Sequence, residues 1–204
     1  TLRWAEVSVE QPRSQGQQVF GIIQGGTDCE LRRYAARTLL DLPFDGYAVG
    51  GLSVGEPENE MLEVLEETHA VVPEAYPRYL MGVGTPPQLV EAVARGTDLF
   101  DCVIPTRVGR NGSAYTRWGC IPIKAGRFKS DFRAIDDTCG CDACRTYSRA
   151  YIRHLLNINE ILGLRLMTVH NLYFYLQLMQ DMRMAIEKGE FAQFRDKFHQ
   201  QYRR

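Results

Sequence analysis

The sequence lacks any hydrophobic run long enough to cross a lipid bilayer, and it shows no signal-peptide pattern. Its net charge is close to zero, −1 over 204 residues, so the total charge alone indicates no polyanionic partner. Its glycine pairs do not form the G-x-G-x-x-G fingerprint of dinucleotide-binding folds. By default, these absences predict a cytoplasmic protein without a membrane partner, and the hydrophobic fraction of 45% is ordinary for a globular domain.

The charge that is present is unevenly distributed. Between Pro105 and Arg133 there are seven basic residues and one acidic residue, Asp131, so this segment carries +6 and the remainder −7. A basic patch on an otherwise acidic protein is the electrostatic footprint of a site for a polyanion. Charge alone leaves open the alternative of a solvated basic face without a partner. The basic residues are Arg107, Arg110, Arg117, Lys124, Arg127, Lys129 and Arg133.

The first half of the chain repeats one unit, in which a short apolar run meets glycine and an amphipathic helical stretch follows. This pattern predicts βα units with parallel strands. Four such units are half of an eight-stranded (β/α)8 barrel, and we expect the chain to be the C-terminal part of a longer protein. The expected strands are 19–24, 46–51, 78–83 and 98–104, and the expected helices are 28–41, 58–71 and 86–94.

From Asn111 onward the pattern changes. Alternating residues over 112–116 and 120–123 predict a hairpin, and helical runs follow at 143–161, 168–187 and 191–202, with Gly163 and Gly189 as expected helix stops. We therefore expect an α/β protein in three parts. These parts are a barrel half (1–106), a basic hairpin with a zinc-binding subdomain (107–167) and C-terminal helices (168–204).

Three cysteines in the spacing C-x-C-x-x-C, Cys139, Cys141 and Cys144, precede His170, which lies in an apolar helical run. Three thiolates and one imidazole are the ligand set of a closed structural zinc site. In an intracellular protein, clustered cysteines bind metal more often than they form disulfides. The alternative is a set of incidental cysteines. The other three cysteines, Cys29, Cys102 and Cys120, are scattered, and we expect them to be buried free thiols.

Asp101 is the strongest catalytic candidate, because it lies in a run, 99–105, that otherwise has the composition of a buried strand. A buried carboxylate is costly unless it is paired or used in catalysis; the alternative is a structural carboxylate that caps a turn. Gln24, directly before a glycine pair, has the donors and acceptor that suit a base edge. The glycine-containing stretches 50–52 and 81–84 are similar, although each alone is also typical of a tight βα turn.

Taken together, these stretches resemble the C-terminal part of the bacterial-type tRNA-guanine transglycosylase family, over essentially the whole chain. The motifs that carry the resemblance are FGIIQGG (20–26), DGYAVGGL (45–52), RYLMGVGTP (78–86), FDCVIPTR with GRNG (100–112), the cysteine cluster and HNL (170–172).

The resemblance implies a TIM barrel with an inserted zinc subdomain, and exchange of guanine at the wobble position of certain tRNAs for a 7-deazaguanine. Asp101 matches the family nucleophile, which attacks the ribose anomeric carbon and forms a covalent intermediate, after the base is flipped from its stack. The matching base-binding positions are Gln24, Gly51, Leu52, Met81 and Gly82, and those that contact the tRNA anticodon loop are Arg107 and Arg110.

The family's other essential aspartates, one a general acid/base and one a base ligand, lie in an N-terminal half that this sequence does not include. A non-catalytic RNA-binding zinc subunit and a purely structural piece of the same fold are therefore alternatives to the enzyme. The resemblance also implies a homodimer, and we expect Tyr147, Tyr151 and His154, with Leu166 nearby in sequence, to contribute to its interface.

Overall fold

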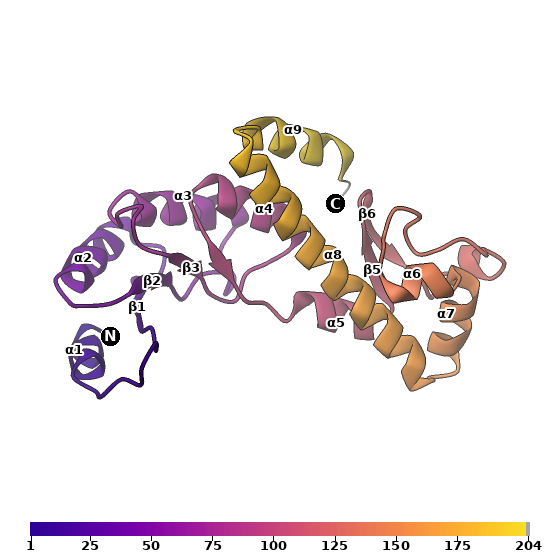
Figure 1. Ribbon diagram of the computed structural model, residues 1–204, viewed down its shortest axis with the longest axis horizontal. Helices are drawn as coiled ribbons and strands as arrows, with labels where there is room; N and C mark the ends of the chain where they lie inside the picture. Colours follow the sequence, from indigo (N-terminus) through magenta and orange to yellow (C-terminus); the bar gives the residue numbers. More distant parts are fainter. Residues whose placement is uncertain (203–204) are drawn as a thin grey trace. The chain divides into compact units, whose positions relative to one another are not determined.

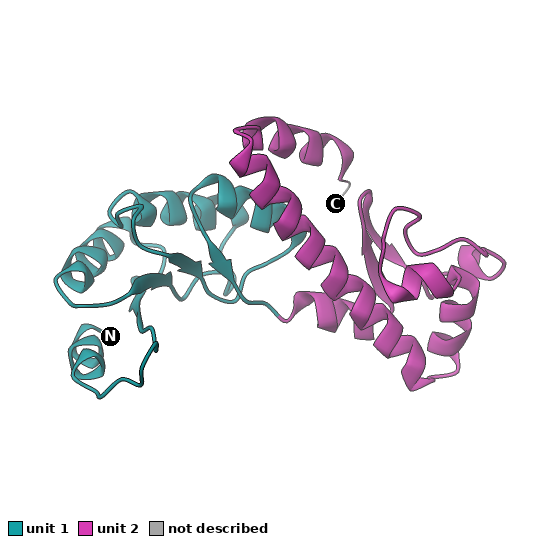
Figure 2. Cartoon of the chain, in the orientation of Figure 1, with its two compact units in different colours: residues 1–102 teal, residues 103–204 magenta. Residues whose placement is uncertain are grey.

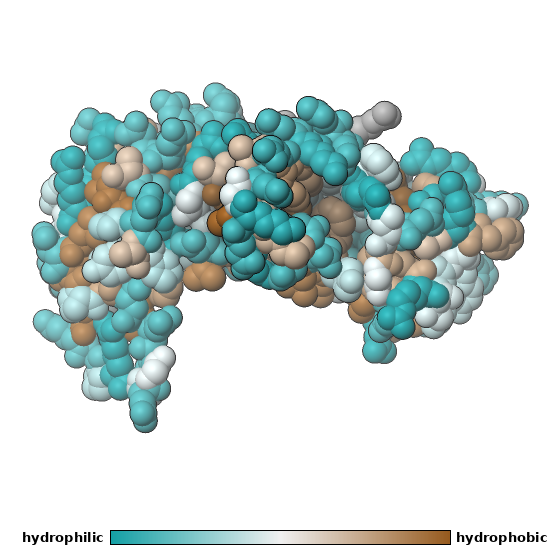
Figure 3. All heavy atoms as spheres, turned by 45° about the horizontal axis from the view of Figure 1, so that its top comes forward, coloured by the Kyte–Doolittle hydropathy of each residue, from teal (hydrophilic) through white to brown (hydrophobic). Residues whose placement is uncertain are grey.

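The computed structural model describes residues 1–202, and Figure 1 shows its helices and strands. The chain divides into two compact units, Thr1–Cys102 and a second that begins at Val103 (Figure 2). On the face drawn in Figure 3 the surface is mostly hydrophilic, with separate hydrophobic patches. None of the helices in the described part of the chain has the length and apolar character that a membrane span needs.

The first unit is a four-stranded sheet with helices between its strands. All neighbouring strands are parallel, in the order β1-β2-β3-β4, which confirms the predicted βα repeat. Among the described residues, β1 and β4 each pair on one side only. The elements are α1 (Leu2–Val9), β1 (Phe20–Ile23), α2 (Cys29–Leu40), β2 (Gly46–Val49), α3 (Glu58–His69), β3 (Arg78–Leu80), α4 (Pro86–Ala94) and β4 (Leu99–Phe100).

Local sequence signals explain where these helices begin. The Asp28 side chain accepts hydrogen bonds from the backbone N–H groups of Glu30 and Leu31 in the first turn of α2, and Thr85 and Gln88 form a capping box ahead of α4. The helices α2, α3 and α4 pack their apolar stripes on one face of the sheet, where Ile23, Leu39 and Tyr47 form one core cluster and Leu65 and Leu80 belong to a second. On the other face, strand residues such as Ile22 and Leu99 are exposed.

The last predicted strand of this unit was wrong in its length. β4 covers Leu99–Phe100 only, and Ile104–Arg110 forms a helix, α5. Pro105 explains the difference, because proline lacks the N–H that a strand ladder needs and is well tolerated in the first turn of a helix.

The second unit combines a hairpin with packed helices. Its elements are α5 (Ile104–Arg110), β5 (Ser113–Thr116), β6 (Gly119–Pro122), the short 3-10 helix η1 (Gly126–Phe128), α6 (Asp142–Thr146), α7 (Arg149–Asn157), α8 (Ile161–Glu187) and α9 (Phe191–Gln201). β5 and β6 are antiparallel, as predicted. The core of the unit combines Ile123, Ile135, Ile152 and Met167 with two of the clustered cysteines.

Two predictions about these helices were wrong. The expected helix over 143–161 is two helices, because Tyr147 is extended and the Ser148 side chain caps α7. Gly163 does not stop a helix but lies buried inside α8, where a Cβ would come within 2.9 Å of Leu155. Glycine is needed there for close packing of α8 against α7. Gly189, with φ +70°, does end α8, as predicted.

The cysteines outside the cluster differ from the expectation of buried thiols. Cys29 and Cys102 are half-buried and Cys120 is exposed. Cys29 is the first residue of α2, Cys102 lies between β4 and α5, and Cys120 lies within β6. A single cysteine carries no sequence signal for the direction of its side chain.

His69, at the end of α3, predicts a pH dependence of stability. It is 5% exposed, and its Nδ1–H donates to the Arg95 carbonyl at 2.8 Å. Burial lowers the pKa of His69 to about 4; the contact with Arg95 and the charge of Asp98 oppose this shift, and that of Arg78 adds to it.

The unfolded chain, with a histidine pKa of about 6.5, therefore binds a proton that the folded chain does not between pH 6.5 and 4. We expect the free energy of unfolding to fall by roughly 3 kcal/mol as pH drops through this window. Urea titrations from pH 4 to 7 measure this, with the exposed His199→Gln as control. If His69→Gln left the pH slope unchanged, another group would be responsible.

Candidate active-site edge and metal centre

Four predicted site segments begin on the same edge of the parallel sheet. The last paired residues of the strands are in register, with Ile23 opposite Val49, Val49 opposite Leu80, and Leu80 opposite Phe100. The residues that follow them are Gln24, Gly50, Met81 and Asp101. The carboxyl-terminal edge of a parallel sheet is where functional groups of α/β proteins gather. The structure thus aligns the predicted nucleophile and the start of each predicted base-binding segment.

Asp101 is held at this edge by two donors. The Tyr79 hydroxyl donates to Asp101 Oδ1 at 2.6 Å, and the Gly82 N–H donates to the same oxygen at 2.9 Å. The hydrogen bond from Tyr79, followed by that from Gly82, lowers the pKa of Asp101, and the same contact raises the pKa of Tyr79 to about 12. At neutral pH, the pair is therefore a carboxylate and a neutral hydroxyl donor.

The prediction that Asp101 lies inside a buried strand was wrong. The residue is exposed, because β4 ends at Phe100 and the carboxylate follows the strand instead of lying inside it. Its environment is set by two hydrogen bonds and not by desolvation. Whether it is the nucleophile stays a prediction.

Gln24 packs against the glycines that follow β2. A Cβ on Gly50 would lie 2.6 Å from Gln24 Nε2, and one on Gly51 would lie 2.7 Å from Gln24 Oε1. Gly51 and Gly82 have φ values of +68° and +74°, which glycine adopts without strain. The Leu52 side chain is buried in the core, so only its backbone is available to a ligand. Met81 is half-buried at the end of β3.

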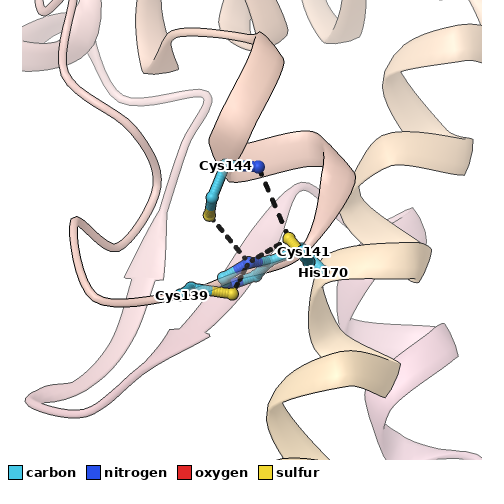
Figure 4. A group of neighbouring side chains, drawn as sticks. All are labelled: Cys139, Cys141, Cys144 and His170. Carbon is cyan, nitrogen blue, oxygen red and sulfur yellow. Dashed lines mark hydrogen bonds between the residues drawn. The ribbon is translucent and has the colours of Figure 1, made fainter.

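The predicted metal ligands come together in the second unit (Figure 4). His170 Nδ1 lies 3.6, 3.5 and 3.3 Å from the Sγ atoms of Cys139, Cys141 and Cys144, and all four ligand atoms lie within 4.8 Å of one another. The three cysteines flank the start of α6 and the histidine comes from α8. This arrangement could hold one metal ion.

Hydrogen bonds from outside the cluster fix the orientation of His170. The imidazole is fully buried, and its Nε2–H donates to the Tyr115 carbonyl at 2.7 Å, so Nδ1 presents its lone pair to the thiolates. The next residue, Asn171, accepts from the Tyr115 N–H and donates to the carbonyls of Ser113 and Pro105. These contacts join the metal-binding helix α8 to β5 and to the start of α5.

All seven basic residues between Pro105 and Arg133 are exposed, as a polyanion site requires. Arg107 and Arg110 lie in the last turn of α5. Within the described residues, only Arg117 and Arg133 of the seven form an ion pair with an acidic side chain. The other five charges thus form no ion pair with a carboxylate in the part of the chain that the structure describes.

The contact of Tyr79 with Asp101 was not predicted from the sequence. A signal was present, because side chains alternate along a strand: Arg78 and Leu80 are buried, while Tyr79 points to the other face. Through the register, Tyr79 is opposite Leu99, two residues before Asp101. A parallel pairing of the strands at 79 and 99 therefore places the Tyr79 hydroxyl within reach of the Asp101 carboxylate.

Comparison with known proteins agrees with these features. The family model for queuine tRNA-ribosyltransferase matches residues 1–204. Proteins named queuine tRNA-ribosyltransferase from Pelotomaculum thermopropionicum and Moorella thermoacetica are each 52% identical over 202 residues, which is 99% of this chain and 55% and 54% of theirs. One from Bacillus velezensis is 50% identical over 203 residues, 99% of this chain and 53% of its own.

The chain spans about half the length of the curated relatives it matches. The family match itself extends over the whole sequence and includes both the edge with Asp101 and the metal cluster. The chain belongs to the queuine tRNA-ribosyltransferase family.

Proposed function

We propose that this chain is the nucleophile-bearing part of a tRNA-guanine transglycosylase, which exchanges guanine at the wobble position of a tRNA for a 7-deazaguanine. The observation that carries the proposal is the Asp101 carboxylate, oriented by Tyr79 and Gly82 on the same sheet edge as Gln24. Three spacings between neighbouring strands separate the two, about 14 Å, which leaves room for a nucleoside between them.

In the proposed reaction, Asp101 attacks the anomeric carbon of the ribose. The new bond from carboxylate oxygen to C1′ forms as the bond from C1′ to guanine N9 breaks, and the departing guanine takes a proton from a general acid. Both fixed donors contact Oδ1, so we assign the attack to Oδ2. The incoming 7-deazaguanine then displaces the carboxylate and gives its N9 proton to the group that had protonated guanine. The exchange therefore restores the enzyme and needs no ATP.

The segments next to Asp101 provide a base pocket in this proposal. The Gln24 amide supplies a donor and an acceptor for the base edge, and Gly51 and Gly82 give a floor without side chains on which a flat ring can lie. Met81 would pack against the ring, and Leu52 would contribute backbone groups.

The anticodon loop of the tRNA is the proposed partner of the basic segment. Its exposed guanidinium groups, including Arg107 and Arg110, suit phosphates. This binding surface belongs to the second unit and does not depend on the Asp101 carboxylate.

The parallel sheet, whose outer strands β1 and β4 each pair on one side only among the described residues, is consistent with half of a TIM barrel. Edges of this kind do not occur in a closed barrel, and the exposed face with Ile22 and Leu99 would then point to the barrel interior. The division into parts 1–106, 107–167 and 168–204 stays a prediction.

Zinc is the metal that the donor set fits best. Bonds of about 2.3 Å to sulfur and 2.05 Å to nitrogen place those atoms about 3.6 Å apart in a tetrahedron, and the observed separations are 3.3 to 3.6 Å. Four protein ligands complete the coordination sphere, so the ion would have a structural role and supply no reacting group.

We also propose a homodimer contact at the start of α7. The rings of Tyr147 and Tyr151 stack at 5.4 Å, and with the exposed Phe132 they line a shallow cavity of about 360 Å³. Exposed His154 lies on the same helix, whereas Leu166 is buried in the core and cannot take part.

Tyr151→Ala should shift the complete natural protein toward the monomer, since it removes one ring of the stacked pair. Mass measurements over a dilution series test this, with the exposed Tyr34→Ala on α2 as control. An unchanged mass profile would return these rings to a purely structural role.

Tyr79→Phe should slow formation of the covalent intermediate by about 10- to 100-fold while tRNA affinity stays within about twofold, because one charge-assisted hydrogen bond to the nucleophile is lost. The pKa of Asp101 should rise, which moves the acidic limb of the rate profile to higher pH. The matched control is Tyr76→Phe, whose ring packs on Tyr47. If both variants reacted equally fast, the contact between Tyr79 and Asp101 would have no catalytic role.

A single-turnover experiment distinguishes the proposed function from its alternatives. Labelled tRNA is mixed with the complete natural protein that carries this sequence, and denaturant-resistant protein–RNA adducts are counted. An adduct and guanine exchange support the enzyme. Binding without an adduct supports a non-catalytic RNA-binding subunit. If the protein neither bound tRNA nor formed an adduct, a purely structural role would be supported. The 204-residue chain alone should not exchange guanine, because it lacks the aspartates that the resemblance assigns to the other half.

A further inference from the structure

Arg32, in the first turns of α2, is the most deeply buried charged residue of the first unit, with 0% exposure. Burial lowers the pKa of its guanidinium, and the charge of Glu56 opposes that shift. Arginine is almost never fully buried unless its charge is paired, and within residues 1–202 the hydrogen bonds of Arg32 go to backbone carbonyls and not to a carboxylate. Its position therefore needs another explanation.

The guanidinium binds two backbone carbonyls that bracket Gln24. Arg32 Nε donates to the Gly26 carbonyl at 2.9 Å, and Nη1 donates to the Ile23 carbonyl at 3.0 Å. The turn between these carbonyls contains two glycines with positive φ, +154° at Gly25 and +59° at Gly26, so the chain there has few conformational restraints of its own. One planar cation fixes both ends of the turn.

The turn from Ile23 to Gly26 determines where the Gln24 amide lies. The amide sits against Gly50 and Gly51, each of which would collide with it if it carried a Cβ. A small displacement of the turn would move this amide off the neighbouring segment.

Arg32 also interacts with the next segment of the site. Glu56, whose charge favours the protonated guanidinium, accepts hydrogen bonds from the N–H groups of Ser53 and Val54. It thereby closes the turn that follows Gly51 and Leu52. The hydrogen bonds of Arg32 hold the turn after β1, and its charge is favoured by a carboxylate of the segment that follows β2.

One donor of Arg32 is left over. Its Nη2 is buried and has no hydrogen-bond partner among the described residues. An unsatisfied buried donor costs about 1–3 kcal/mol. The cost is understandable if the two carbonyl contacts serve the site.

We propose that Arg32 is a positioning residue for base recognition, which fixes the Gln24 amide by holding the Ile23 and Gly26 carbonyls. The inference rests on the proposed function and assigns Arg32 no contact with the base. It predicts that base affinity depends on Arg32 while tRNA affinity does not.

The test measures 7-deazaguanine affinity by calorimetry, and tRNA affinity in parallel, in the complete natural protein. Arg32→Met should weaken base binding at least tenfold and leave tRNA binding within twofold. Arg32→Lys, which can reach only one carbonyl, should give an intermediate base affinity. Arg37→Met, an exposed position on the same helix, is the matched control and should bind the base like the wild type.

A purely structural role would lower the melting temperature of both Arg32 variants without a selective loss of base affinity. If Arg32→Met does not fold, the base affinity of Arg32→Lys is measured below the melting temperature of that variant. An affinity equal to that of the wild type overturns the inference. A wild-type protein that binds tRNA but no 7-deazaguanine would overturn the proposed function and this inference together. If the wild type binds 7-deazaguanine and Arg32→Lys binds it equally tightly, this inference alone is overturned.

Discussion

Asp101→Asn in the complete natural protein should abolish both the covalent RNA adduct and guanine exchange, a loss of at least about 10⁴-fold. Asparagine keeps the size of the side chain and can still accept from the Tyr79 hydroxyl and the Gly82 N–H, which hold Oδ1. It lacks the negative charge that attack on the anomeric carbon requires. The fold should be unaffected, because the carboxylate is exposed and its two contacts are retained.

Binding of tRNA should persist in this variant. In the proposed complex, the exposed basic groups of the second unit bind phosphates of the tRNA, and none of them needs Asp101 for its charge. The experiment compares adduct formation, exchange of labelled guanine and tRNA affinity. Asp41→Asn, an exposed carboxylate just after α2, is the matched control. An adduct that persisted in Asp101→Asn would assign the nucleophile to another residue.

The parts of the fold that could be predicted are those with a local signal. The helix over 58–69 follows from its apolar period, and the four parallel strands follow from glycine after each apolar run. The end of β4 could not be placed in this way, because the apolar residues 102–105 suit a strand or a helix equally and Pro105 decides between them. Gly163 is typical of a helix stop in the sequence, but its role is to allow close contact between α8 and α7. Packing between two helices cannot be predicted from the residues next to the glycine.

The candidate site shows the same division. The metal ligands could be named because three of them fall within six residues of sequence and chemistry restricts the fourth. The contact of Tyr79 was missed because it joins two neighbouring strands. The contacts of Arg32 were missed because they go to backbone carbonyls, for which the sequence has no signal. Asp101 was predicted as a site residue because its strand was expected to be buried, but its side chain is exposed. Register and hydrogen bonds, which a single sequence does not encode locally, are what connect it to Tyr79.

Removal of zinc should unfold the metal-binding region of the second unit, from about Asn111 to Thr168. Cys141 and Cys144 are part of the hydrophobic core of this unit, together with Ile123, Ile135 and Ile152. Without a cation, three thiols and an imidazole crowd within 4.8 Å of one another. Structural zinc contributes an apparent free energy of about 10–16 kcal/mol in zinc-finger peptides, which is as large as the whole stability of a typical domain, about 5–15 kcal/mol.

The first unit should stay folded under the same treatment, since its two core clusters contain none of the ligands. Hydrogen exchange before and after a chelator should therefore lose protection over 111–168 and keep it over 20–100, and metal analysis should find one zinc per chain. Cys144→Ser should behave like the chelated protein, and Cys29→Ser, outside the cluster, like the wild type.

Because His170 and Asn171 also bind Tyr115, Ser113 and Pro105, the loss should extend to α5 and weaken tRNA binding through Arg107 and Arg110. Retained protection over 111–168 after complete zinc removal would show that packing alone maintains this unit.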